Sequence, residues 1–212
     1  MTIYQIDYLP EKTAFPIDFI ESNLELKKLS RVPLQAEIKI YMKNRFKLTD
    51  FFEGDLSNEN YYFVSDRLKN IFSINNNPGL EFFPVEVFHK KNKYSYYVLN
   101  FLEDMSENID FVNINFSLLN KITGQKIMDY KLKNLKEYIS KANKISGLHE
   151  IKFENDLIKF ESQLTKIPKI ISLDLFLSGR IGITEEIKNK LMEDKITGVR
   201  FVCEKKIGVD IF

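Results

Sequence analysis

Two segments of the chain align without a gap at a constant offset of 119 residues. Residues 64–83 read VSDRLKNIFSINNNPGLEFF, and residues 183–202 read ITEEIKNKLMEDKITGVRFV. Such a repeat constrains the fold strongly, because both copies must then form the same local structure. We therefore predict two copies of one unit, in residues 62–88 and 181–206. Since only four of the twenty aligned pairs are identical, the alternative is a chance recurrence of a common local pattern.

Each segment has the residues that start a helix and then turn into a strand. Ser65 and Thr184 occupy equivalent positions, and a short hydroxyl side chain there can accept a hydrogen bond from an otherwise unpaired helix N–H. An acidic residue follows each of them, in the first turn, where the helix dipole favours an anion. Gly79 and Gly198 then precede an apolar–X–Phe pattern. The prediction is a cap, a helix, a glycine and a strand in each copy.

Most of the remaining chain has strand character. Eighteen Phe and ten Tyr occur with no Trp, and aromatic residues of this kind favour strands. Alternation of polar and apolar residues predicts strands at residues 1–8, 36–42, 80–88 and 94–102. The lysine-rich residues 90–93 suit the loop of a hairpin. Residues 48–60 are acidic and include a glycine, so we expect a loop with one helical turn there.

One stretch has helical spacing. Apolar residues from Met128 to Ala142 recur at intervals of four, three, four and three, which predicts a helix over residues 128–143. Six lysines lie between Lys126 and Lys144. A solvated helix face explains them more simply than a nucleic-acid-binding patch.

The predicted fold class is therefore α+β. We expect residues 1–212 to form a single domain with a mixed, mainly antiparallel sheet and a few helices. This domain contains the two copies of the cap–helix–glycine–strand unit. Residues 111–169 lie between the copies and are expected to be an insertion.

Charge and cysteine content bear on partners and compartment. Thirty-one Lys and Arg oppose thirty Asp and Glu, so the whole chain has no bulk attraction to nucleic acid or to anionic lipid. We expect neither nucleic acid nor membrane as a partner. Cys203 is the single cysteine, which excludes an intrachain disulfide and favours a reducing compartment. The N-terminus alternates like a strand and lacks the basic start of a signal peptide, so we expect a cytoplasmic protein.

The residues that usually carry catalysis are absent or poorly spaced. His89 and His149 are the only histidines, and neither has a second ligand at metal-binding spacing. The chain has no phosphate-binding glycine loop and no nucleophile elbow. Residues 104–115 resemble a calcium loop, but Ile109 stands where that loop needs glycine. We therefore expect no catalytic residue, no metal and no cofactor.

Several motifs together resemble a known family. In chain order they are Asp50-Phe51-Phe52, Val64-Ser65-Asp66-Arg67-Leu68, Gly79-Leu80-Glu81-Phe82, Tyr96-Tyr97-Val98-Leu99-Asn100 and Thr197-Gly198-Val199-Arg200-Phe201. They resemble the immunity proteins of bacterial polymorphic toxin systems over residues 48–104 and 170–202. The resemblance implies a protein that binds and neutralises a cognate toxin. It brings no binding residues with it.

An inhibitor that binds its target tightly commonly uses a charged surface that steers association. The candidate surface in this chain is acidic and has two clusters, namely Asp50, Glu53, Asp55 and Glu59, and then Glu103, Asp104, Glu107 and Asp110. The simpler interpretation of either cluster alone is a solvated loop.

Two other functions stay open at the level of sequence. One is an enzyme or small-ligand-binding protein with a carboxylate-lined cleft. The other is a structural module of a secretion or phage-like assembly. A deep pocket with converging carboxylates would favour the first, and a repeating oligomer in solution would favour the second.

Overall fold

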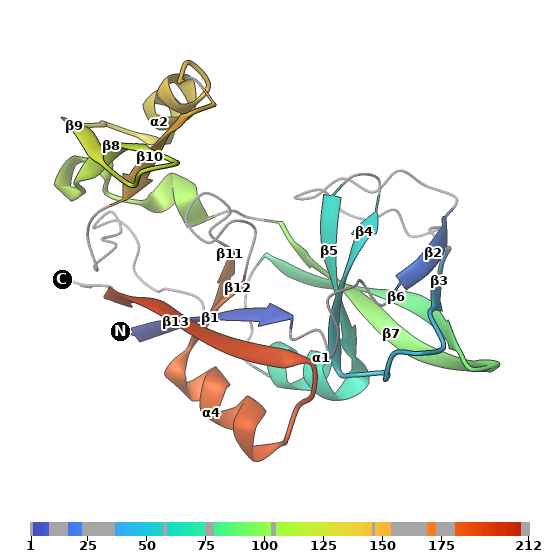
Figure 1. Ribbon diagram of the computed structural model, residues 1–212. Coiled ribbons are helices and arrows are strands. Elements are labelled where there is room, and N and C mark those ends of the chain that lie inside the picture. Colours follow the sequence, from blue (N-terminus) through green and yellow to red (C-terminus); the bar gives the residue numbers. More distant parts are fainter. Residues whose placement is uncertain are drawn as a thin grey trace.

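A computed structural model gives the architecture of the chain (Figure 1). It describes residues 2–8, 17–22, 37–56, 59–74, 79–102, 105–145, 147–153, 169–172 and 181–208. Within these ranges the chain forms three sheets and three α-helices. The fold is α+β, as the sequence predicts.

The largest sheet has six strands in the order β2-β3-β6-β7-β5-β4. Their bounds are Ile17–Ser22 for β2, Ile38–Met42 for β3, Phe51–Leu56 for β4, Glu59–Ser65 for β5, Leu80–His89 for β6 and Asn92–Phe101 for β7. Only β3 and β6 run parallel, and every other neighbouring pair is antiparallel. The sheet is therefore mixed and mainly antiparallel.

A second sheet has four strands in the order β11-β12-β1-β13, all antiparallel. Their bounds are Thr2–Tyr8 for β1, Ile170–Ser172 for β11, Ile181–Thr184 for β12 and Val199–Gly208 for β13. The N-terminal alternation thus predicted a strand correctly. Cys203 lies in β13, but its side chain is outside the described part of the structure.

A third, smaller sheet has the order β10-β8-β9 and lies apart from the other two in Figure 1. Its strands are β8 (Phe116–Asn120), β9 (Lys126–Tyr130) and β10 (His149–Phe153), and α2 (Leu135–Ala142) packs against it. Two short 3-10 helices, η1 (Met105–Asn108) and η2 (Phe111–Asn113), precede it. That residues 111–169 are an insertion stays a prediction.

The main hydrophobic core lies between the two larger sheets and inside the curl of the six-stranded one. Phe52 and Phe63 are fully buried and stack with ring centroids 5.1 Å apart. The curl brings β2 close to β4, since a Cβ atom at Gly54 would lie 1.9 Å from Cδ1 of Ile17. Aromatic residues of the kind that favoured strands in the sequence thus pack in this core, together with a larger number of Ile, Val and Leu side chains.

Helices α1 (Asp66–Ser73) and α4 (Glu185–Glu193) begin where the sequence predicts. Ser65 is the N-cap of α1, and its Oγ accepts a hydrogen bond from Leu68 N at 3.3 Å. Thr184 is the N-cap residue of α4, but its side chain makes no capping bond. Its Oγ1 is buried and has no partner in the described structure. The position of Thr184 was thus predicted correctly and its capping bond was not.

Gly79 and Gly198 stand between each helix and the following strand, as expected. Their φ angles are 84° and 83°, in the left-handed region that glycine adopts without strain. Gly198 also lies close to the start of β4. A Cβ atom there would be 2.1 Å from the carbonyl oxygen of Phe51 and 2.6 Å from Oγ1 of Thr49.

Two expectations from the sequence are wrong. Residues 48–60 contain the antiparallel strands β4 and β5, not a loop. Phe51 and Phe52 are both fully buried, and burial of two aromatic side chains outweighs the local acidic composition. The second error is the helix over residues 128–143, because Met128 lies in β9 and α2 begins only at Leu135. Asn134 caps that helix by accepting a hydrogen bond from Glu137 N at 2.9 Å.

The hairpin predicted from the alternation of residues 80–102 is confirmed, with a tighter turn than expected. Strands β6 and β7 pair over their whole length, from Leu80 with Phe101 to His89 with Asn92. Lys90 and Lys91 alone form the turn, with φ angles of 48° and 66°. Positive φ at both positions matches the turn type whose twist suits a two-residue hairpin loop.

Replacement of Gly198 by alanine is expected to destabilise the protein by more than about 3 kcal/mol, because left-handed strain adds to a clash with backbone. Gly124→Ala is the matched control, since Gly124 also has a positive φ, of 69°, but no atom within 4 Å of its Cβ position. It should cost only about 1–2 kcal/mol. Urea denaturation monitored by circular dichroism measures both. Equal losses in the two variants would contradict the close contact at Gly198.

The two helix starts predict unequal effects. Ser65→Ala should cost about 1–2 kcal/mol, since it removes a cap that bonds to the backbone. Thr184→Val should change the free energy of unfolding by less than about 0.5 kcal/mol, because the buried Oγ1 of Thr184 has no partner to lose. Chemical denaturation of the two single variants and the double variant tests this. If Thr184→Val lowered the free energy of unfolding as much as Ser65→Ala does, Oγ1 of Thr184 would have a hydrogen bond, which would contradict the structure.

Candidate partner-binding surfaces

Asp50 leads the first predicted acidic cluster, and the structure places its carboxylate inside the protein. The side chain is 10% exposed. Its Oδ1 accepts a hydrogen bond from Ser65 Oγ at 2.7 Å. Its Oδ2 accepts two from Thr197, from the backbone N at 3.0 Å and from Oγ1 at 2.9 Å. A carboxylate with three donors is well satisfied, so Asp50 serves the interior of the fold.

The bonds around Asp50 join the six-stranded sheet to the turn between α4 and β13. Phe51 N donates to the carbonyl oxygen of Thr197 at 3.2 Å. Arg67, on α1, places Nη1 3.6 Å from Asp50 Oδ2 and also donates to the carbonyl oxygen of Asp194. We call Asp50, Phe51, Ser65, Arg67 and Thr197 the Asp50 junction. Three of the sequence motifs that resemble the immunity family meet in it.

Burial by itself raises the pKa of Asp50, because it disfavours the charged form. The hydrogen bonds from Thr197 and Ser65, together with the charge of Arg67, outweigh burial and hold the pKa below its ordinary value of 3.8. The carboxylate is therefore ionised at neutral pH and attracts all of its donors. Burial also raises the pKa of neighbouring Tyr96, whose hydroxyl donates to the carbonyl oxygen of Thr49 at 2.8 Å.

The other members of the first acidic cluster lie on the β4–β5 hairpin. Glu53 is half-buried on β4. Asp55 and Glu59 lie near the end of the hairpin, where Asp55 pairs with Asn60 and Leu56 pairs with Glu59. The side chains of Asp55 and Glu59 are outside the described residues. Asp50 therefore does not share an exposed surface with the rest of its predicted cluster.

The second acidic cluster is described only in part. Glu103 and Asp104 lie outside the described residues. Glu107 is exposed on η1. Asp110 is half-buried and caps η2, with its Oδ1 accepting a hydrogen bond from Asn113 N at 3.4 Å. Asp110 therefore supports local structure, and Glu107 is the member whose carboxylate faces solvent.

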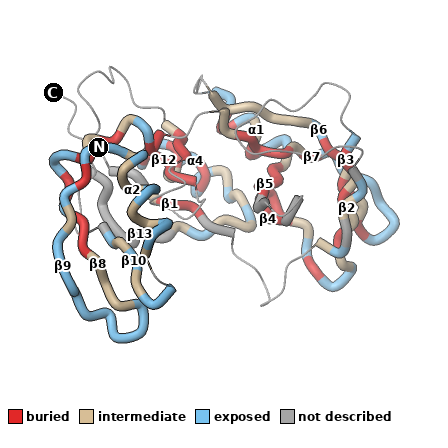
Figure 2. The backbone as a smooth tube through the Cα atoms, turned by 90° about the horizontal axis from the view of Figure 1, so that it is seen from above, coloured by how far each residue is buried: buried red, intermediate tan, exposed pale blue. Residues whose placement is uncertain are grey.

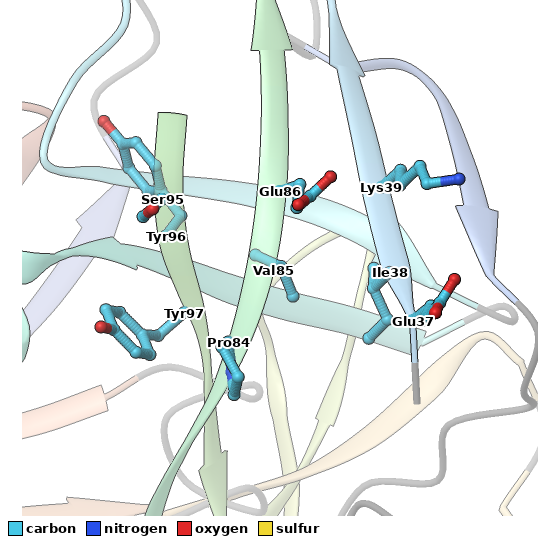
Figure 3. A pocket seen from close by; sticks show the side chains of 9 residues that line it. All are labelled: Glu37, Ile38, Lys39, Pro84, Val85, Glu86, Ser95, Tyr96 and Tyr97. Carbon is cyan, nitrogen blue, oxygen red and sulfur yellow. The ribbon is translucent and has the colours of Figure 1, made fainter. Parts of the chain in front are cut away.

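The structure also contains a groove that the sequence analysis missed. It has a volume of about 420 Å³ and lies over strands β3, β6 and β7 (Figure 3). Neighbouring positions in the sheet register line it, since Lys39 pairs with Glu86 and Pro84 pairs with Tyr97. The lining comes from three short runs of consecutive residues, 37–39, 84–86 and 95–97. The sequence predicted the strands that hold these runs, but it could not show which strands would be neighbours.

The charges of the groove are largely paired with one another. Lys39 Nζ lies 3.3 Å from Glu21 Oε1, and hydrogen bonding to Glu21 raises the pKa of Lys39. Glu86 forms an ion pair with Lys93. The ring of Tyr97 is covered by Lys69, whose Nζ lies 4.0 Å from the ring centroid. Such a surface suits a peptide or protein loop better than a small charged ligand.

Side chains that could bind a metal ion are dispersed in the described part of the structure. Across these ranges no group of three or more His, Cys, Asp or Glu side chains is placed to hold a metal ion. The carboxylates of the groove do not converge on a common point, as Figure 3 shows for Glu37 and Glu86. Among the helices that the structure describes, none is long and apolar enough to cross a membrane.

The model of the Immunity protein family (Imm11) matches residues 9–161, more than half of the chain, and the protein belongs to this family. Membership implies neutralisation of a toxin through binding rather than catalysis. No curated protein matches the chain.

The family match and the motif resemblance differ in extent. The match includes residues 111–161, which the motifs leave out. It ends before residues 170–202, which the motifs include. The small sheet and α2 therefore lie within the matched part of the chain, and Thr197 of the Asp50 junction lies beyond it.

The lowered pKa of Asp50 predicts a pH-dependent loss of stability. A depressed pKa in the folded state contributes stability above the unfolded value, and that contribution is lost as the pH falls through the folded pKa. Asp50→Asn should therefore cost about 1–3 kcal/mol at pH 7. The difference from the wild type should shrink below pH 3.8, the ordinary value. Urea denaturation at several pH values measures it.

Asp129→Asn is the matched control, because the side chain of Asp129 is 70% exposed. Its effect should be small at every pH. A pH-independent loss in Asp50→Asn would contradict the ionised state of the junction.

Proposed function

We propose that this protein neutralises one cognate toxin by forming a stoichiometric complex with it. The observation that carries the proposal is the family match over residues 9–161. Long paired strands and an internally bonded junction support it, because a preformed surface loses little conformational entropy on binding. Formation of the complex blocks the toxin, so neutralisation requires no chemical step on it.

The proposed contact surface includes the acidic residues in η1 and just before it in the chain. Glu107 is exposed there, and Glu103 and Asp104 precede it in the chain. Asp50 and Asp110 instead support the scaffold, since both accept hydrogen bonds from their own chain. Charges at the rim of an interface mainly accelerate association. The proposed role of these carboxylates is therefore to steer a toxin with a basic surface.

We also propose that the scaffold contains two copies of one unit. The strand orders β4-β5-β7-β6 and β11-β12-β1-β13 support this, with β1 taking the place of β7. The registers agree at the offset of 119 residues. Phe51 pairs with Val64, and Ile170 pairs with Ile183. The bond from Ser65 N to the carbonyl oxygen of Asp50 has its counterpart between Thr184 and Lys169.

The copies differ at the position that bonds them together. Asp50, just before β4, corresponds at the same offset to Lys169, just before β11, when these strands are counted with the copies that they precede. Asp50 reaches Thr197 in the second copy, whereas Lys169 forms an ion pair with Glu186 on α4 within its own copy. On this proposal one copy supplies the carboxylate and the other supplies the turn that binds it. The scaffold that presents the toxin-binding surface is therefore asymmetric.

Toxin binding is tested with the protein encoded next to this one. Co-expression should rescue growth from that protein's toxicity, and the purified pair should elute as a 1:1 complex. Reversal of Glu103, Asp104 and Glu107 to lysine should slow association by about tenfold and weaken its dependence on salt. Stopped-flow or surface-plasmon measurements give the rate constants. Stability should change by less than about 0.5 kcal/mol.

A groove variant, Ser95→Arg, serves as the comparison, because Ser95 is exposed and lines the groove. If the wild type rescues growth but the acidic triple variant associates with the toxin as fast as the wild type, the acidic contact is contradicted. Loss of binding in Ser95→Arg alone would move the contact to the groove. Absence of any complex or rescue would contradict the proposed function itself.

A further inference from the structure

Positive charge is concentrated in one part of the molecule. The whole chain has a formal net charge of only +1, but residues 111–153 contain eight lysines and three acidic residues. This stretch forms the small sheet with α2. Its lysines do not share one helix face, as the sequence analysis expected, because Lys126 lies in β9 and Lys121 and Lys152 lie in or beside other strands. They therefore need another explanation.

Exposed aliphatic side chains gather in the same part. Nine large hydrophobic residues are exposed in the described structure, and six of them lie between residues 112 and 148. These six are Val112, Ile122, Ile127, Met128, Ile139 and Leu148. Ile122 is 78% exposed, the largest value of the nine. The small sheet thus combines apolar exposure with positive charge.

Two of these residues, Ile122 and Leu148, lie side by side at one end of the small sheet. Ile122 lies in the turn between β8 and β9, and its backbone N donates to Asn120 Oδ1 at 2.9 Å. Leu148 lies beside that turn, because Lys121 N donates to its carbonyl oxygen at 2.9 Å. Lys144 is four residues before Leu148, so the chain holds its Cα within about 14 Å. We call Lys121, Ile122, Lys144 and Leu148 the apolar–basic tip.

The tip is open to solvent. The turn between β8 and β9 forms an outer end of the molecule in Figure 2, where it is coloured as exposed. Hydrogen bonds hold its backbone in place, including those from Ile122 and Thr123 to the side chain of Asn120. In the described structure neither Lys121 nor Lys144 forms an ion pair with an acidic side chain. The hydrogen-bonded turn therefore presents Lys121 and Ile122 to solvent, with Leu148 beside it and exposed Lys144 four residues before Leu148 in the chain.

The chemistry of the tip distinguishes among possible occupants. The centres of protein–protein interfaces are depleted in lysine and enriched in aromatic residues. Binding of single-stranded nucleic acid uses exposed aromatic rings on which bases stack. Between residues 111 and 153 the described exposed apolar side chains are aliphatic or Met, not aromatic. Aliphatic side chains flanked by lysines instead match the surface of a bilayer, with its acyl chains below anionic headgroups.

We propose that the apolar–basic tip binds the surface of a bilayer that contains anionic lipid. Ile122 and Leu148 enter the boundary between headgroups and acyl chains, and Lys121 and Lys144 contact lipid phosphates. The protein lies on the membrane and does not cross it. This binding is separate from the proposed toxin neutralisation and does not require it. The expectation of no membrane partner rested on the charge of the whole chain, whereas this proposal rests on the charge of one part of it.

Sedimentation with sucrose-loaded vesicles tests the proposal. Vesicles of phosphatidylcholine alone are compared with vesicles containing about 30% phosphatidylglycerol, at about 0.1 M salt. Wild-type protein should sediment with the anionic vesicles at least tenfold more than with the neutral ones. Salt at about 1 M should abolish the difference, because it shortens the screening length to about 3 Å.

Two variants separate the contributions, and a third is the control. Ile122→Ser with Leu148→Ser should weaken binding at least tenfold, by removing apolar insertion. Lys121→Glu with Lys144→Glu should reduce binding to the level of neutral vesicles, since each lysine near an anionic surface contributes about fivefold. Ile74→Ser with Met192→Ser changes exposed apolar residues elsewhere, at 75% and 58% exposure, and should bind like the wild type.

Three results would overturn the proposal. The first is equal binding of the wild type to neutral and anionic vesicles. The second is a loss in the control variant as large as that in the tip variants. The third is retention of labelled single-stranded RNA in a gel-shift assay with no vesicle binding, which would assign the lysines to nucleic acid. Circular dichroism of each variant confirms that the fold is kept.

Discussion

The buried carboxylate of Asp50 is the interaction on which the arrangement of the two larger sheets depends. A charge removed from water is costly unless donors surround it, and Asp50 has donors from Ser65 and Thr197. Ser65 ends β5 of the six-stranded sheet and Thr197 lies in the turn before β13 of the four-stranded sheet, so satisfying the carboxylate requires that the two sheets meet. The meeting is close, since the Phe51 carbonyl leaves no room for a Cβ atom at Gly198. The buried charge and the close packing therefore both specify the Asp50 junction.

The Asp50 junction explains why the family motifs occur together in the sequence. Asp50-Phe51-Phe52, the segment around Ser65 and the Thr197-Gly198 turn are far apart in the chain and converge in the Asp50 junction. They identify the scaffold, so the resemblance predicts the fold class well and carries no information about the toxin. The candidate contact surfaces in the described part of the structure lie elsewhere, in the groove over β3, β6 and β7, at exposed Glu107 and at the apolar–basic tip.

Charge balance in the whole chain conceals a separation of charge in space. The net charge of +1 excludes a strong overall field, yet the small sheet with α2 has a marked excess of lysine. Forces at a surface act over about one screening length, roughly 10 Å, so a partner responds to the local excess and not to the total. An acidic contact near Glu107 and a basic tip near Ile122 can therefore serve different partners in one nearly neutral protein.

The sequence by itself determined the features that depend on neighbouring residues. The start of α1 at Ser65, the hairpin of β6 and β7, and the left-handed positions of Gly79 and Gly198 all follow from signals within a few residues. Only the tertiary structure decided that residues 51–56 and 59–65 form strands and that Asp50 is internal. The bond from Asp50 to Thr197 joins residues 147 positions apart. The local sequence pattern could not reveal this bond. A carboxylate in a solvated loop and a carboxylate in a buried junction can have the same neighbours in sequence, and they differ only in the hydrogen-bond donors that distant parts of the chain place around them.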